Sequence, residues 1–104
     1  MLVIVATLDF HPDDMPTALE LTRTICVETL REKGCHHYSF AVDNLNPGRF
    51  QIAEWWESED DLQAHLRMAH VDVFRSAIGS LRFLGTDAKQ FEVVSVGPVN
   101  VPED

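Results

Sequence analysis

Two histidines in the second half of the chain, His65 and His70, have the side chains best suited to proton transfer. Histidine titrates near neutral pH, so it can accept and release a proton under ordinary conditions. The two lie five residues apart, and on a straight helix that spacing turns their side chains about 140° from each other. Metal-binding histidine pairs on one helix prefer a spacing of four residues, so we predict no metal site. A break in the helix would still turn both toward a pocket.

A glutamate occupies a position in a strand pattern where apolar residues are expected. Glu54 alternates along the chain with three apolar residues and should share a strand face with them. These neighbours are Phe50, Ile52 and Trp56. A buried carboxylate needs a partner. One of the helix histidines would make Glu54 part of an acid–base pair, which predicts a catalytic role for Glu54, His65 and His70. Arg67 or Arg75 would instead make a purely structural ion pair, and both interpretations are open.

Aromatic residues are placed to line a pocket for a ring-shaped ligand. Tyr38 and Trp56 fall on corresponding faces of two adjacent predicted strands. Their rings would form apolar walls, and the Tyr38 hydroxyl would fix the ligand's orientation. Phe74 and Thr7 are the further candidates for substrate binding. For each aromatic residue the alternative interpretation is an ordinary place in the core.

Hydrophobic periodicity predicts the elements that must position these residues. We expect a strand over 2–10, then a helix that starts near Asp13 or Asp14 and ends at Gly34. Strands over 36–43 and 49–57 should form a hairpin, followed by an amphipathic helix over 60–78 with a break near Met68 and Ala69. The last strand is predicted over 90–96. This β-α-β-β-α-β order indicates a single α+β, ferredoxin-like domain over residues 1–104, with a four-stranded antiparallel sheet and both helices on one face.

Such a sheet leaves its second face uncovered, and that face is predicted to be apolar. Ala53 and Trp55 would lie on it. An exposed apolar face indicates a partner surface. Two copies packed sheet to sheet would form a homodimer with a closed, barrel-like core, a dimeric α+β barrel.

Composition excludes several classes of partner. The 104 residues carry a net charge of −9, which disfavours nucleic acid, anionic membrane surfaces and highly anionic substrates. The apolar run at the N-terminus has no basic flank and ends at Asp9, too early for a signal peptide or a membrane span. Cys26 and Cys35 match no redox or zinc motif, so we expect them to be reduced and the protein to be cytoplasmic.

The segment from Glu32 to Phe74 resembles the antibiotic biosynthesis monooxygenase family. The matching positions are Gly34, Cys35, Tyr38, Pro47, Phe50, Glu54, Trp56, Ser58, His65, His70 and Phe74. The resemblance implies a homodimeric α+β barrel with a pocket between sheet and helices. It further implies a monooxygenase that oxidises a small aromatic phenol or quinol, with molecular oxygen as co-substrate and no metal or organic cofactor.

Other activities occur on the same fold, because fold alone does not determine function. Haem-degrading relatives use an asparagine in the first strand, and the strand predicted over 2–10 contains none. Haem degradation is therefore disfavoured. A proton-shuttling isomerase and a non-catalytic dimer that binds a small ligand are the alternatives that the sequence leaves open.

Overall fold

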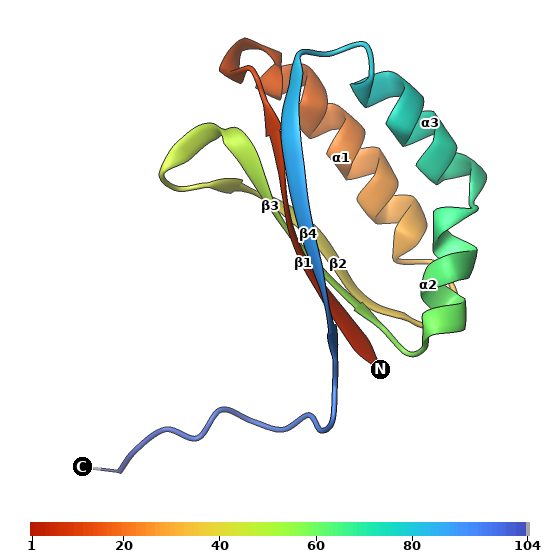
Figure 1. The fold of residues 1–104 in the computed structure, drawn as a ribbon, viewed down its shortest axis with the longest axis vertical. Coiled ribbons are helices and arrows are strands. Elements are labelled where there is room, and N and C mark those ends of the chain that lie inside the picture. The colour runs from red at the N-terminus through yellow and green to blue at the C-terminus, as the bar shows by residue number, and fades with distance from the viewer. Residues whose placement is uncertain (104) are drawn as a thin grey trace.

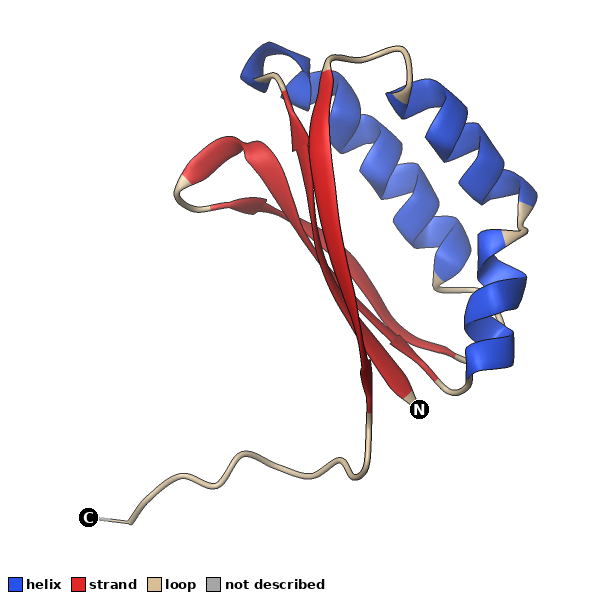
Figure 2. Ribbon diagram, in the orientation of Figure 1, coloured by secondary structure: helices blue, strands red, loops and turns tan. Residues whose placement is uncertain are grey.

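The computed structural model describes residues 1–103 and contains one antiparallel sheet with helices packed against it. The elements in order are β1 (Leu2–Phe10), the short 3-10 helix η1 (Pro12–Asp14), α1 (Met15–Thr29), β2 (Cys35–Asp43), β3 (Asn46–Trp56), α2 (Glu59–Leu66), α3 (Ala69–Ile78) and β4 (Phe83–Glu92). The four strands are ordered β2-β3-β1-β4 (Figure 1). All the helices cover the same face of the sheet (Figure 2). The predicted ferredoxin-like α+β fold is confirmed.

The core lies between the helices and alternate residues of the two central strands. Side chains of a strand point alternately to its two faces, so every second residue of β1 and β3 meets the helix layer. The buried ones are Leu2, Ala6, Leu8, Phe10, Phe50, Ile52 and Trp56. The strand alternation predicted for the hairpin therefore holds, and Glu54 falls on the helix-facing side between Ile52 and Trp56.

The first helix is shorter than predicted. It ends at Thr29 rather than at Gly34. The backbone leaves the helix through tight turns in which Arg31 N bonds to Glu28 O and Glu32 N to Thr29 O. Gly34 then adopts a left-handed conformation with φ of 80°, which glycine tolerates because it has no Cβ. Glu32 thus lies in the connection to β2, not on the helix.

The last strand was predicted in the wrong place. The structure has it at Phe83–Glu92 instead of 90–96. β4 runs antiparallel to β1, from Phe83 opposite Phe10 to Glu92 opposite Leu2. Since β1 begins at Leu2, residues beyond Glu92 have almost no strand left to pair with. Their apolar side chains suggested a strand, but as far as residue 103 these residues have no strand of this chain beside them to pair with.

The predicted break in the second helical segment is confirmed. Ser58 caps α2 by accepting a hydrogen bond from Asp61 N at 3.1 Å. Arg67 and Met68 separate α2 from α3, and Met68 is extended, with φ of −69° and ψ of 146°. Within residues 1–103, every helix is too short or too polar to cross a lipid bilayer.

Candidate active site

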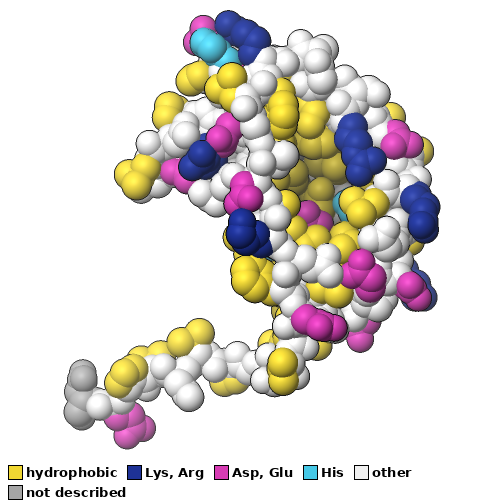
Figure 3. Space-filling model, viewed as in Figure 1, with side chains coloured by type: hydrophobic (Ala, Val, Ile, Leu, Met, Phe, Trp, Pro, Cys, Tyr) yellow, Lys and Arg dark blue, Asp and Glu magenta, His cyan; other side chains and the backbone are white. Residues whose placement is uncertain are grey.

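A cavity of about 380 Å³ lies between the sheet and the helices α2 and α3. Among the residues that line it are four of the predicted site residues: Tyr38, Glu54, His65 and Phe74. Most of the remaining wall is aliphatic. Figure 3 shows a hollow in this side of the molecule, with hydrophobic side chains over most of its interior. This volume falls in the usual range for small-molecule sites.

Three other predicted site residues lie outside this cavity. Trp56 is fully buried beneath His65, with their ring centroids 4.8 Å apart. His70 lines a separate groove between α1 and α3. Thr7 belongs to the opposite face of the sheet, where it lines a shallow pocket with Val5 and Asp87. Odd-numbered residues of β1 point away from the helices, so Thr7 lies on the outer face of the sheet, away from the histidines.

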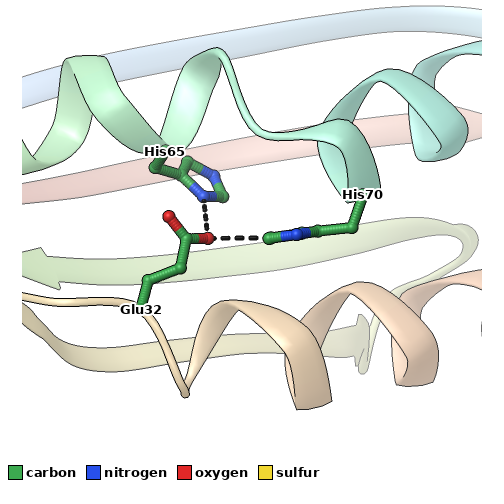
Figure 4. Close-up of side chains that lie close together, drawn as sticks. All are labelled: Glu32, His65 and His70. Carbon is green, nitrogen blue, oxygen red and sulfur yellow. Dashed lines mark hydrogen bonds and ion pairs between the residues drawn. The ribbon is translucent and has the colours of Figure 1, made fainter.

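The two histidines meet on one carboxylate, that of Glu32. His65 Nδ1 lies 2.7 Å and His70 Nε2 lies 2.8 Å from Glu32 Oε2. In Figure 4 the imidazoles of His65, from α2, and His70, from α3, both point at this oxygen of Glu32. The exposed fractions of the side chains are 3% for His65, 6% for Glu32 and 20% for His70. A buried carboxyl group with two imidazole partners at these distances is well satisfied.

The break between α2 and α3 is what brings the histidines together. His65 belongs to the last turn of α2 and His70 to the first turn of α3. The extended residue Met68 changes the chain direction between them, which compensates for the angle that a straight helix would impose. Thr29, at the end of α1, adds a contact from its hydroxyl to His70 Nε2 at 3.3 Å.

Glu32 is the residue of this candidate site that the sequence did not predict. The predicted helix extends to Gly34 and so places Glu32 in its last turn. An acidic residue near a helix C-terminus is electrostatically disfavoured. The presence of Glu32 there was therefore the one signal in the sequence that it serves another purpose than ending the helix. The prediction that Glu54 pairs with a helix histidine, Arg67 or Arg75 is wrong. Its hydrogen-bond partner is Trp56 Nε1, which donates to Glu54 Oε1 over 3.0 Å.

Glu54 and Tyr38 have shifted acidities because both face the apolar cavity. Burial raises the pKa of Glu54 above its ordinary value, and the Trp56 hydrogen bond and nearby His65 only partly offset this. Burial also raises the pKa of the Tyr38 phenol, and the Glu54 charge adds to the effect. Tyr38 is therefore a neutral hydroxyl at physiological pH, able to donate a hydrogen bond. Its ring lies 5.3 Å from that of His65.

The carboxylate and the two imidazoles also form a set of atoms that could hold a divalent metal ion. Their ligand atoms all lie within 4.8 Å of one another. However, ligands around one tetrahedral ion with bonds of about 2.0–2.1 Å stand roughly 3.3 Å apart. The contacts of 2.7 and 2.8 Å are shorter and are those of hydrogen bonds. This spacing favours an acid–base cluster over a metal centre.

Comparison with known proteins identifies related chains. A family model described as antibiotic biosynthesis monooxygenase matches residues 1–77. The probable quinol monooxygenase YgiN of Escherichia coli (strain K12) is 28% identical over 88 residues, which covers 75% of this chain and 85% of YgiN.

Solved structures show the same fold. A Deinococcus radiodurans protein with the same family assignment superposes with a TM-score of 0.89 at 23% identity, covering 96% of this chain and 99% of its own. Rv0793 from Mycobacterium tuberculosis superposes with a TM-score of 0.83 at 18% identity, covering 93% of this chain and 98% of its own. At these identities the likeness establishes the fold alone.

Proposed function

The chain belongs to the antibiotic biosynthesis monooxygenase family, and from this premise we propose that it oxidises a small phenol or quinol with molecular oxygen, without a metal or organic cofactor. The observation that carries the proposal is the position of His65. This imidazole lines an apolar cavity and is held through Nδ1 by the buried Glu32 carboxylate. Its other nitrogen, Nε2, is then the one available to a ligand.

His65 acts as the general base for the substrate hydroxyl. A carboxylate bonded to one imidazole nitrogen orients the ring and stabilises the positive charge that forms when the other nitrogen takes a proton. Glu32 has this relation to His65. The apolar walls of the cavity suit an aromatic ring, and the Tyr38 hydroxyl offers it a hydrogen bond.

The reaction needs no electrons beyond those of the substrate. His65 Nε2 removes the phenolic proton, and the electron-rich phenolate reduces oxygen and forms a bond to it at a ring carbon. The peroxide formed there takes a proton from His65. The ring carbon then loses its hydrogen as a proton, the O–O bond breaks, and water leaves. A phenol and one O₂ thereby become a quinone and one water.

Oxygen consumption by the wild type and His65→Asn tests the proposal. Asparagine can keep a hydrogen bond to Glu32 in place of Nδ1 but has no basic nitrogen. We expect kcat for quinol oxidation to fall by roughly 10²–10⁴-fold. Labelled O₂ should place one oxygen atom in the quinone formed from a monophenol. Product formation that continues unchanged under anaerobic conditions would contradict the proposal.

An isomerase is the second candidate, and the joint presence of His65 and Glu54 in the cavity wall favours it. Two titratable groups that face one ligand can remove a proton at one carbon and return it at another. Such an enzyme would work without oxygen and would exchange substrate hydrogen with solvent deuterium. Anaerobic turnover with deuterium incorporation selects this function over oxygenation.

We also propose that the protein is a homodimer that buries the outer face of the sheet. This face carries exposed apolar side chains, among them Val5 in the central strand β1 and Phe91 in the edge strand β4. The helices cover only the other face (Figure 2). Sheet-to-sheet packing would remove these side chains from water.

A further inference from the structure

The groove that contains His70 lies on the far side of α3 from the cavity that contains His65. Its volume is about 150 Å³, and it is formed by α1 and α3. Ile25 and Phe74 line both spaces and so form part of the wall between them. His70 faces only the groove, and His65 faces only the cavity.

Glu32 connects the two histidines through this wall. Both imidazoles contact the same carboxylate oxygen, Oε2, at 2.7 and 2.8 Å. The exposed fraction of the side chains rises from 3% at His65 to 6% at Glu32 and 20% at His70. Figure 4 shows the three side chains in contact. Since His65 lines the cavity and His70 lines the groove, they form a continuous hydrogen-bonded path between the two.

We propose that Glu32 and His70 relay protons between His65 and the solvent in the groove between α1 and α3. This inference rests on the proposed function, in which His65 takes a proton from a phenol. A ring bound against His65 would stand between its Nε2 and the water in the cavity. A route through Glu32 and His70 to the groove lets His65 lose its proton while the substrate stays bound.

The transfer is balanced at each atom. His70 takes part in the tautomer that carries its proton on Nδ1, so that Nε2 has a free lone pair. His65 gains the substrate proton at Nε2 and passes its Nδ1 proton to Glu32 Oε2. The protonated Glu32 then donates this proton to His70 Nε2, and His70 releases its own Nδ1 proton to water in the groove. No bond other than those to hydrogen is made or broken, and one proton has crossed from cavity to solvent. Delivery of a proton to the peroxide runs in reverse.

Other polar groups near the path do not offer a second route. Tyr38 from β2 and Glu54 from β3 face the cavity, so they lie at the same end as His65. Cys35 adjoins this region, but burial raises its pKa to about 11, so it stays protonated. Thr29 contacts His70 Nε2 from the end of α1 and can help hold that ring. Glu32 is the group that contacts both imidazoles.

The test uses His70→Gln, with His36→Gln as the matched control. Glutamine can place its amide nitrogen near the position of Nε2 and keep a hydrogen bond to Glu32, but it cannot carry a proton onward. His36 also contacts a carboxylate, that of Glu57, but it is exposed on β2. We expect His70→Gln to lower kcat at least about tenfold with KM unchanged and Tm within about 4 °C. His36→Gln should leave kcat unchanged.

Rescue by added imidazole separates a relay from a structural role. Imidazole can enter the space that His70→Ala leaves in the groove, so it should restore kcat of His70→Ala in proportion to its concentration. It should not restore activity to Glu32→Gln, because the glutamine still fills that buried position. A His70→Gln variant with undiminished kcat, or a loss in His70→Ala that imidazole leaves untouched, would overturn the relay.

A non-reacting phenol keeps this test independent of oxygenation. Bound 4-nitrophenol turns yellow when it ionises, and a rapid jump to higher pH without oxygen reports how fast its proton leaves the cavity. With protein in excess, the colour should appear at least about tenfold more slowly in His70→Gln than in the wild type or His36→Gln. Equal rates contradict the relay, even if quinol oxidation is confirmed. Slower rates support it, even if oxidation is never observed.

Discussion

Two carboxylates approach His65, and their surroundings give them different tasks. Glu32 lies within hydrogen-bond distance of two imidazoles, whereas Glu54 accepts one hydrogen bond from an indole. Burial raises the pKa of Glu54, and its single neutral donor does not cancel that effect. Pairs of titratable groups with contrasting environments are a common basis for acid–base assignment. Glu32 fits the role of an orienting carboxylate and Glu54 that of a ligand-facing acid.

The raised pKa of Glu54 makes a prediction about stability. A group whose pKa is higher in the folded state favours folding below its ordinary pKa, and that contribution is lost as pH rises through the folded value. Glu54→Gln removes the cost of ionising a buried carboxyl at higher pH, and it keeps an oxygen acceptor for Trp56. The free energy of unfolding of the variant relative to the wild type should increase from about pH 4 toward neutrality, by on the order of 1 kcal/mol.

Urea denaturation at a series of pH values measures this difference. Glu92→Gln is the matched control, since it removes an exposed carboxyl at the end of β4 with the same change in charge. A difference between Glu54→Gln and the wild type that shrinks with rising pH would show that the ionised form of Glu54 is stabilised in the fold.

The cluster of Glu32, His65 and His70 makes a prediction about metals. Its hydrogen-bonded spacing predicts that activity does not depend on a bound ion. Extended dialysis against a chelator should leave kcat and Tm of the protein unchanged. Zinc, iron(II) or manganese(II) added in equimolar amount should not raise Tm. A rise in Tm that His70→Gln abolishes would instead establish a metal centre.

At the scale of single residues, the sequence predicted cavity residues better than their partners. Tyr38, Glu54, His65 and Phe74 line one cavity. Strand alternation determines that Tyr38 and Glu54 face the helices, and helical periodicity determines that His65 and Phe74 face the sheet. The hydrogen bonds between them depend on long-range packing. Glu32 and His65 are 33 positions apart, and local periodicity carries no information about such contacts. For this reason the pairing of Glu54 was mispredicted and Glu32 was missed.

The turn between α1 and β2 is the element that holds Glu32 in place. Gly34 O accepts a hydrogen bond from Glu57 N at 2.8 Å, which ties the turn to the end of β3. The first turn of α2 packs against the same glycine. A Cβ on Gly34 would lie 2.8 Å from Asp61 Cβ and closer still to its carboxyl. The turn that carries Glu32 and the helix that carries His65 are therefore fitted to each other.

Gly34→Ala should lower the free energy of unfolding by about 2 kcal/mol or more, since a non-glycine residue in this conformation costs about 1–3 kcal/mol before any clash. Addition of Asp61→Ala should recover the part due to the clash with the Asp61 carboxyl, but neither the part due to the contact with the Cβ of residue 61 nor the part due to φ. Gly85→Ala is the control, because a Cβ there meets nothing within 4 Å. Urea denaturation gives the three values, and equal losses for Gly34→Ala and Gly85→Ala would contradict this account.

At the scale of elements, sequence patterns succeeded where local signals agreed with packing. Ser58 at the start of α2 and the break at Met68 were both predicted and both occur. β4 was misplaced because it is an edge strand with most of its residues exposed. Its residues therefore lack the alternation that marks a half-buried strand. The bounds of β4 depend on the length of β1, the strand with which it pairs. The residues of β4 alone therefore do not determine where it begins and ends.

The whole molecule has one covered and one uncovered sheet face, and this asymmetry sets its expected assembly. Val5 pairs with Ala53 near the middle of the sheet. Val5 is 48% exposed and Phe91 is 52% exposed. Apolar side chains gathered on one face are a usual mark of a protein interface. An isologous contact between two copies covers both faces at once.

Val5→Lys should therefore convert a dimer into a monomer. Two lysines forced together in an apolar interface would lose water and repel each other, and such buried, unpaired charges are strongly unfavourable. Light scattering coupled to gel filtration should give about twice 11.8 kDa for the wild type and 11.8 kDa for the variant. Leu45→Lys, at a 92% exposed position in the β2–β3 turn, is the control and should stay dimeric. A Val5→Lys variant that keeps the wild-type mass would place the interface elsewhere. Because Val5 is exposed and not part of the core, circular dichroism of the monomer should retain the wild-type spectrum, which separates loss of assembly from loss of fold.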